Sequence, residues 1–401
     1  MTTQLAPTST VHVSDEFDPL MRRLDDVHDL LDSTADESER LGDLTDAAAR
    51  ALRDSGALKI SVPRELGGYE FSPRQAIDTI ARVSHADASA GWSFMAVQMV
   101  TGTTAAYLGA EAVRDLYPDV AGDRYATIAG QGTKMGTATR VEGGYRISGR
   151  WHFASGISLA SHIHTAAFCE ETGEALVFTL PKDRVTLIDN WDVMGLRATR
   201  SIDYTCEDVF VPQTHVYPVA TTHAHHGGAA YRIGLANMAG VCHTGWALGV
   251  GRRMLDELKA LVASKSGTPN ASVDTHQFYA EYAEAESRLR AARSWAMEVW
   301  ADNEATLDRG EHLSTEQETL TRLMLNNTTW SVQAVGQMVH KWAATAALRR
   351  GPLQRFFRDL HSGTQHVTSG PVVLQNCGKW LSGLAAPEAR WVFLDLQEPR
   401  S

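Results

Sequence analysis

The chain has 401 residues, of which 43% are hydrophobic and 21% are charged, and its formal net charge is −11. This length predicts roughly two or three domains, and the negative charge argues against nucleic acid or an anionic membrane surface as a partner. No run of about 18 apolar residues is present, so no transmembrane helix is expected. The polar residues 1–14 predict a flexible arm rather than a secretory signal, and four cysteines with neither zinc-site nor Cys-x-x-Cys spacing fit a reducing cytoplasm.

Residues 15–118 predict an N-terminal helical domain. Apolar side chains recur at helical spacing over residues 17–31, and a second helix is expected over residues 41–52. A further helix is expected to begin after Ser72, because serine caps helix N-termini and Pro73 fits the first helical position.

Residues 119–225 predict a small antiparallel β domain. The pair Gly143-Gly144 is a hairpin signal, and the residues after it alternate as those of a strand do. The expected strands cover residues 145–148, 163–168, 175–180 and 204–211.

Residues 226–401 predict a C-terminal helical domain. A seven-residue apolar repeat runs from Phe278 through Tyr282 and Leu289 to Val299. Such a narrow stripe predicts packing against other long helices, from this subunit or from a partner subunit.

Residues 352–366 contain the pair Arg358-Asp359, followed by His361 and His366. The imidazoles could donate hydrogen bonds and shuttle protons. Past Asp359, however, no Asp or Glu occurs before Glu388, so the segment has no later carboxylate that could take a proton from carbon. The Arg-Asp pair is interpreted as a structural brace, and His361 is expected behind the site or at the surface.

The expected hairpin strand is followed by Trp151-His152-Phe153-Ala154-Ser155-Gly156. Together with residues 352–366, this run resembles the flavin-dependent monooxygenases built on the acyl-CoA dehydrogenase fold. The turn at residues 62–68 and the run at residues 87–92 resemble the N-terminal domain of the same fold, so the resemblance extends from about residue 18 to the end of the sequence. It implies a mainly α chain with a small central antiparallel β domain, between an N-terminal helical domain and a C-terminal four-helix bundle.

The resemblance also implies residue roles. Ser155 is expected near flavin N5 and the oxygen adduct, and His366 is expected over the flavin, where it assists substrate deprotonation or steadies the hydroperoxide. The residues implied to bind the cofactor are Trp151, Phe153, Ala154, Ser155, Thr199 and Ser201, and those implied to bind substrate are Trp92, Gln98 and Arg197. The alternatives are a strand end with a buried tryptophan for Trp151 and a β-turn with a surface side chain for Arg197.

The sequence departs from the dehydrogenases of this fold, which need a carboxylate base in one of two places. Residues 209–255 and 360–387 contain no Asp or Glu, so both places lack one. In the helix after Trp92, where some relatives carry a histidine, Gln98 is the amide present, and the sequence predicts no second catalytic histidine there. Residues 337–342 replace a run that holds the adenine of FAD, which favours FMNH2 as the flavin and leaves FADH2 open.

These features predict the oxygenase component of a two-component system. Reduced flavin from a separate reductase and O2 would form a C4a-hydroperoxyflavin, which hydroxylates an aromatic or heteroatom-containing small molecule. The alternatives are an acyl-CoA dehydrogenase or oxidase and a helical oligomer without catalysis. A homotetramer in the cytoplasm is expected, without nucleic-acid or membrane partners. The histidines at residues 223–226 are interpreted as part of a solvated linker, and no metal site is predicted.

Overall fold

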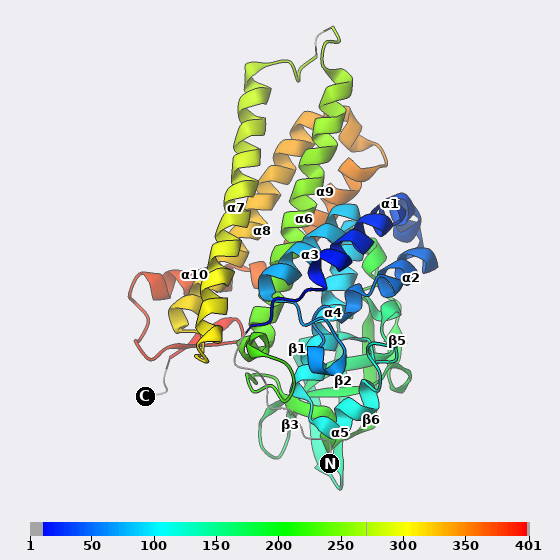
Figure 1. Cartoon of the computed structure of the whole chain (residues 1–401), viewed down its shortest axis with the longest axis vertical. Coiled ribbons are helices and arrows are strands. Elements are labelled where there is room, and N and C mark those ends of the chain that lie inside the picture. The colour runs from blue at the N-terminus through cyan, green and yellow to red at the C-terminus, as the bar shows by residue number, and fades with distance from the viewer. Residues whose placement is uncertain (1–10, 270, 399–401) are drawn as a thin grey trace.

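The computed structural model describes residues 11–269 and 271–398, and its elements follow one another in three groups along the chain (Figure 1). Of the predicted arm, residues 1–10 lie outside the described part, and Ser14 donates its backbone N–H to Gln75 Oε1 at 3.0 Å. The first group is helical. Its helices are α1 (Phe17–Leu41), α2 (Asp46–Asp54), α3 (Pro73–Ala86), α4 (Ala88–Tyr107) and α5 (Ala110–Leu116).

The boundaries of these helices follow their capping residues. Helix α2 begins at Asp46 rather than at residue 41, because Gly42 ends α1 at a φ of 70°. Thr45 then accepts a hydrogen bond from Ala48 N at 3.2 Å and caps α2. The predicted cap of α3 is confirmed, since Ser72 and Gln75 form a reciprocal capping box.

Helix α4 lies at the centre of the molecule. Asp87 separates it from α3 in an extended conformation and caps it by accepting from Ala90 N at 2.7 Å. Nearly all residues of α4 are buried, whichever side of the helix they lie on. A helix that is apolar all round must be covered on every face, which explains this central position.

The second group forms a seven-stranded sheet with the order β5-β6-β2-β1-β3-β4-β7. The predicted hairpin is confirmed, because β1 and β2 pair antiparallel around Gly143. The predicted antiparallel pairing holds for the other strand pairs of this sheet, but β1 and β3 pair in parallel, with Gly130 opposite His164. After β2 the chain returns through residues 152–161, so β3 starts beside the start of β1. The strands are β1 (Ile128–Val141), β2 (Gly144–Trp151), β3 (His162–Cys169), β4 (Ala175–Pro181), β5 (Thr186–Ile188), β6 (Asp203–Pro212) and β7 (Val216–Pro218).

The third group is the predicted C-terminal bundle, in which α6, α7, α8 and α9 pack against one another (Figure 1). Helix α6 also packs along α3 and α4, and so joins the bundle to the first group. Within the two described ranges, no helix is long and apolar enough to cross a membrane. The elements are α6 (Gly234–Lys265), α7 (His276–Asp308), α8 (Thr315–Ala343), α9 (Pro352–Gly363), α10 (Pro371–Leu381), β8 (Arg390–Val392) and β9 (Asp395–Gln397).

The apolar stripe of α7 is covered within the chain itself. Phe278 and Leu289 are each 5% exposed, and the Phe278 ring packs edge-on against Trp342 of α8 at 5.1 Å. Tyr282 is partly buried against the same core. The stripe therefore does not require a partner subunit, and the expectation of a homotetramer loses this support.

Candidate active site

A cavity of about 920 Å³ opens where the three groups of elements meet. Its wall is formed by the start of α4, the first part of α6, the starts of β1 and β3, and the loops at residues 191–201 and 361–368. No Asp, Glu, Lys or Arg is among the described residues that line it. Of the predicted site residues, the cavity brings together Trp92, Phe153, Ser155, Ser201 and His366.

A chain of hydrogen bonds runs along one side of this wall. Trp92 Nε1 donates to Ser155 Oγ at 3.1 Å, and Ser155 Oγ lies 2.7 Å from Ser201 Oγ. Ser201 Oγ lies 2.6 Å from Thr199 Oγ1, which donates its own proton to Leu196 O at 2.8 Å. Because each hydroxyl has one proton, Ser201 must donate to Thr199 and Ser155 must donate to Ser201. Ser155 Oγ is thereby left as an acceptor.

Two loops hold this chain in place. Ala154 N donates to Ile202 O at 3.0 Å and Gly156 N donates to Thr199 O at 2.9 Å, so the two loops are joined by backbone hydrogen bonds. Between them Phe153 has a positive φ of 64° and is 61% exposed. A bulky residue at positive φ is strained, and such strain is concentrated at functional sites. The exposed ring offers an apolar face at the cavity.

His366 is fixed by its neighbour in the chain. It caps the short 3-10 helix η9 (Val367–Ser369), and its Nδ1 accepts from Thr368 N at 3.4 Å and lies 2.8 Å from Thr368 Oγ1. A ring nitrogen that accepts from an amide carries no proton, so in the neutral ring the proton lies on Nε2. Burial lowers the pKa of His366 to about 4, which keeps the ring neutral at pH 7.

His243 of α6 is a site residue that the sequence analysis missed. Its ring lies 3.9 Å from the His366 ring, centroid to centroid, and 5.0 Å from the Trp92 ring. Burial, with a smaller contribution from the nearby His366, lowers its pKa well below the usual value. The helix after Trp92 carries no histidine, as the sequence predicts, and His243 comes from a different helix. The available signal was a single polar ring in the apolar run at residues 241–250.

Five predicted residues lie behind the cavity wall or away from it. Trp151 is fully buried, donates from Nε1 to Ala166 O at 2.9 Å and stacks on Tyr204, which is the buried strand end given above as the alternative. Gln98 is buried against Ser61 and donates from Nε2 to Cys242 Sγ at 3.2 Å. The side chains that do not line the cavity are Trp151, Ala154, Thr199, Gln98 and Arg197, of which Arg197 is exposed.

The pair Arg358-Asp359 braces the loop that forms part of the wall, as its structural interpretation predicts. Arg358 Nη1 donates to Met194 O at 2.8 Å and pairs with Glu39 of α1, while Asp359 Oδ1 accepts from Leu196 N at 2.6 Å. Burial, with a contribution from the charge of Asp87, raises the pKa of Asp359 to about 7.

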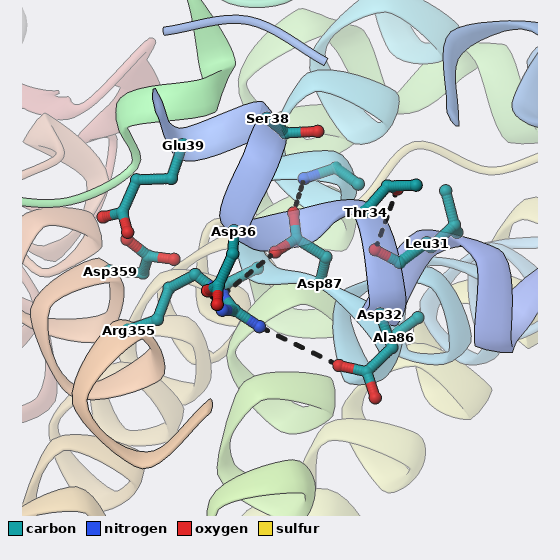
Figure 2. Close-up of polar contacts among 12 residues, drawn as sticks. Leu31, Asp32, Thr34, Asp36, Ser38, Glu39, Ala86, Asp87, Arg355 and Asp359 are labelled. Atoms are coloured by element: carbon teal, nitrogen blue, oxygen red, sulfur yellow. Dashed lines mark hydrogen bonds and ion pairs between the residues drawn. The ribbon is translucent and has the colours of Figure 1, made fainter. Parts of the chain in front are cut away.

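The same region holds a cluster of charged side chains from three helices (Figure 2). Arg355 of α9 pairs with Asp36, lies 3.8 Å from Asp32 and 3.6 Å from Asp87, and so joins α1 and α4 to α9. Figure 2 shows the carboxylates of Glu39 and Asp359 on the far side of Arg355 from Asp32. This cluster positions α9, and with it the loop that carries His366.

The remaining histidines of interest are His361 and those of residues 223–226. His361 lines the cavity, where Nδ1 donates to Phe357 O at 2.7 Å and Nε2 lies 3.3 Å from Gln333 Nε2. His226 is buried and pairs with Glu65 at 2.9 Å, so the interpretation of residues 223–226 as a fully solvated linker is wrong for that residue. In the described part of the chain, no group of three or more His, Cys, Asp or Glu side chains could hold a metal.

Known proteins share this fold and are similar in sequence over most of the chain. The family model for "Acyl-CoA dehydrogenase, C-terminal domain" matches residues 241–370. The chain is 28% identical to an indole-3-acetate monooxygenase of Pseudomonas putida, over 94% of this chain and 96% of that protein. It is 27% identical to a flavin-dependent monooxygenase oxygenase subunit of Rhodococcus jostii (strain RHA1), over 88% of this chain and 94% of that protein. The crystal structure of a 3-HSA hydroxylase from Rhodococcus sp. RHA1 has a TM-score of 0.86 and 25% identity, with 92% of this chain and 98% of that chain covered. Residues 241–370 therefore match the acyl-CoA dehydrogenase C-terminal domain, and the chain is similar over most of its length to flavin-dependent monooxygenases.

Proposed function

We propose that this protein is the oxygenase component of a two-component system, which takes reduced flavin from a separate reductase and uses O2 to hydroxylate an aromatic or heteroatom-containing small molecule. The observation that carries the proposal is the cavity wall, which combines serine hydroxyls, a pair of adjacent histidines and aromatic rings with no carboxylate or cation among the described lining residues. A mostly apolar wall with a few fixed polar groups suits a flat ring system.

The hydroxyl chain fits reduced flavin better than oxidised flavin. Reduced flavin supplies the electrons that activate O2, and its ring carries an N–H at N5 that the oxidised ring lacks. Ser155 donates its proton to Ser201 and keeps an oxygen lone pair. Ser155 Oγ would accept from N5–H, and Phe153 would offer its exposed ring to the face of the flavin.

His366 would act as a neutral donor within the same cavity. Its Nε2 proton is placed by the Thr368 contacts, and burial keeps the ring uncharged. Such a ring can stabilise an oxygen atom that gains negative charge by donating a hydrogen bond to it from Nε2. His243, whose ring lies against His366 at an interplanar angle of 32°, would act as a positioning residue that limits rotation of the His366 ring.

An acyl-CoA dehydrogenase or oxidase is the alternative, and it requires a carboxylate base. No Asp or Glu lines the described cavity wall. Asp359, the acidic residue of the C-terminal motif, points Oδ1 at Leu196 N instead. The wall therefore offers imidazole and hydroxyl groups where dehydrogenation needs a strong base.

Oxygen-18 labelling tests the proposal directly. The protein is mixed anaerobically with photoreduced FMN and indole or resorcinol, labelled O2 is added, and the product is analysed by mass spectrometry. Incorporation of one labelled oxygen atom is expected. Anaerobic reduction of the oxidised flavoprotein by octanoyl-CoA, together with unlabelled products, would favour the dehydrogenase instead.

Affinity for the two flavin states gives an independent test. One additional hydrogen bond, from N5–H to Ser155, contributes about 0.5–1.5 kcal/mol, which corresponds to up to roughly tenfold tighter binding of reduced FMN. Equilibrium titrations under nitrogen measure both constants. Equal affinities, or tighter binding of oxidised FMN, would contradict the role of Ser155. FMN over FAD, the homotetramer and the cytoplasmic location are predictions of the same proposal.

A further inference from the structure

A second histidine site lies at the far end of the cavity from His366. His164 is near the start of β3, opposite Gly130 of β1, and its side chain is 2% exposed. The parallel pairing of these two strands brings both strand starts to the cavity. The proposed reaction does not use His164.

One nitrogen of His164 is held and the other is available. Nδ1 lies 3.2 Å from the hydroxyl of Tyr217, which is itself buried. Nε2 makes no hydrogen bond to any described residue, although the side chain lines the cavity. A Cβ atom added to Gly132 would lie 3.1 Å from Nε2 and 3.7 Å from Leu235 Cδ2, so Nε2 faces the space between Gly132 and Leu235. A buried polar atom with no protein partner is costly unless a ligand or water satisfies it.

The two ends of the cavity are separated by a length of helix α6. Leu235 marks the His164 end, and His243 marks the His366 end of the same helix. A helix rises about 1.5 Å per residue, so these positions lie about 12 Å apart along its axis. That length exceeds a single benzene ring and accommodates two fused or linked rings.

The wall between the two ends is uncharged. Leu235, Ala236 and Ala239 of α6 line the cavity together with Met95 and Met99 of α4, and no charged residue is among the described lining side chains. Burial lowers the pKa of His164 to about 4, so this imidazole is neutral at pH 7. A ligand carboxylate or phosphate would find no cation at this end, whereas a hydroxyl or carbonyl would find a hydrogen-bond partner.

We propose that His164 is a substrate anchor, and that the substrate is an uncharged aromatic molecule of two or more rings with a hydroxyl or carbonyl group at the end remote from the oxygenated atom. This inference rests on the proposed monooxygenase function, and His164 Nε2 is assigned as the partner of the remote polar group.

A matched pair of probes tests the anchor. The affinities of 4-phenylphenol and biphenyl, which differ by one hydroxyl, are measured by equilibrium dialysis with wild-type protein, His164→Phe and His164→Gln. In the wild type the hydroxyl should improve affinity about threefold to tenfold, the contribution of one neutral hydrogen bond. His164→Phe should abolish this preference while still binding biphenyl. His164→Gln should keep part of it, because the amide can still form a hydrogen bond.

The charge prediction has its own probe. Biphenyl-4-carboxylate should bind at least about tenfold more weakly than 4-phenylphenol, because desolvating a carboxylate without a cation is unfavourable. Tighter binding of the carboxylate would overturn the uncharged class of substrate. Equal affinities of 4-phenylphenol and biphenyl in the wild type, or an unchanged preference in His164→Phe with a native circular-dichroism melt, would overturn the anchor.

His366→Ala separates the anchor from the reaction. This variant should keep the preference for 4-phenylphenol and lose hydroxylation of that probe. If the wild type shows the preference but incorporates no labelled oxygen with reduced FMN, the proposed function fails and the anchor stands. If the wild type binds neither two-ring probe, the proposed substrate size is wrong.

Discussion

Thr368 determines which ring nitrogen of His366 carries the proton. The Thr368 amide faces Nδ1, so the neutral ring presents an N–H from Nε2. Ser155 is left as a hydrogen-bond acceptor towards a ligand, because its own proton is donated to Ser201. The cavity thus contains one fixed donor and one fixed acceptor before any ligand binds, a form of preorganisation that enzymes use to lower barriers.

Removing either group should impair hydroxylation. Ser155→Ala and His366→Ala are each expected to lower product formation by about tenfold or more, because each loses a hydrogen bond made to the reacting groups. Product formed per reduced flavin consumed is the measurement. Ser161→Ala, a serine that does not line the cavity and bonds to Thr127 O, is the matched control. Coupled product formation at the wild-type rate in either site variant would refute its assigned role.

His243 should act through His366 and not through the substrate. His243→Phe keeps an aromatic ring against His366 and is expected to retain more activity than His243→Ala, which leaves a gap beside the imidazole. Both variants should lower kcat more than they raise KM, since they disturb the orientation of a reacting group. A large rise in KM with unchanged kcat would instead indicate direct substrate contact.

At the residue scale, the sequence pointed to loops that border the cavity but did not distinguish side chains that face it from buried ones. Ser155 and His366 lie on the cavity wall, while Trp151 in the same run as Ser155 turns into the sheet and stacks on Tyr204. Alternation along a strand decides which side chain faces the cavity, and a motif does not state where the strand ends. His243 was missed because helix α6 brings it to the site from a distant part of the chain.

Among the elements, α1, α4 and α9 meet at a group of acidic side chains around Asp359 (Figure 2). Asp87 and Glu39 face Asp359 with like charge, Arg358 faces it with opposite charge, and Leu196 N donates to it. Burial is the largest cause of its raised pKa of about 7. Helix α9 is therefore held by a carboxyl group that resists ionisation.

This pKa predicts how stability depends on pH. The unfolded pKa of Asp is about 3.9, so the folded protein holds the proton more tightly between about pH 4 and pH 7. The free energy of unfolding should fall as pH rises through that window and stay lower above it. Asp359→Asn keeps an oxygen that accepts from Leu196 N and does not ionise. Its free energy of unfolding relative to that of wild type should therefore rise from pH 5 to pH 8. In thermal melts, the Tm of Asp359→Asn minus the Tm of wild type should be at least about 2 °C larger at pH 8 than at pH 5. The same Tm difference at both pH values would contradict the prediction.

At the element scale, local signals predicted the start of α3 and the hairpin, but they did not predict the long-range strand pairing or the start of α2. The cap at Ser72 and the turn at Gly143 are read from adjacent residues. The parallel pairing of β1 with β3 depends on where the chain returns after residue 161, which no local pattern specifies. The apolar stripe of α7 was correctly assigned to helix packing, but its partner, α8, lies in the same chain.

For the whole molecule, the homotetramer stays a prediction and now rests on other residues. Leu374 and Leu381 of α10 are 48% and 50% exposed, and they lie two helical turns apart on one face. Exposed apolar groups of this kind favour association. Light scattering at micromolar protein should give about four times the chain mass of 43.8 kDa, and the double variant Leu374→Glu with Leu381→Glu should give a smaller species. A wild-type mass near that of one chain would rule out the tetramer.

The parallel start of β1 and β3 has a consequence for how such a protein can change over evolution. It places the groups proposed to select the ligand on the sheet and at the Leu235 end of α6, about 12 Å along that helix from His243, whose ring lies against His366. Substitutions around Gly132 and Leu235 can therefore alter which compound is accepted while the hydroxyl chain at Ser155 keeps its geometry. Gly132→Ala, which would place a methyl group 3.1 Å from His164 Nε2, is a single-step route from a longer ligand to a shorter one.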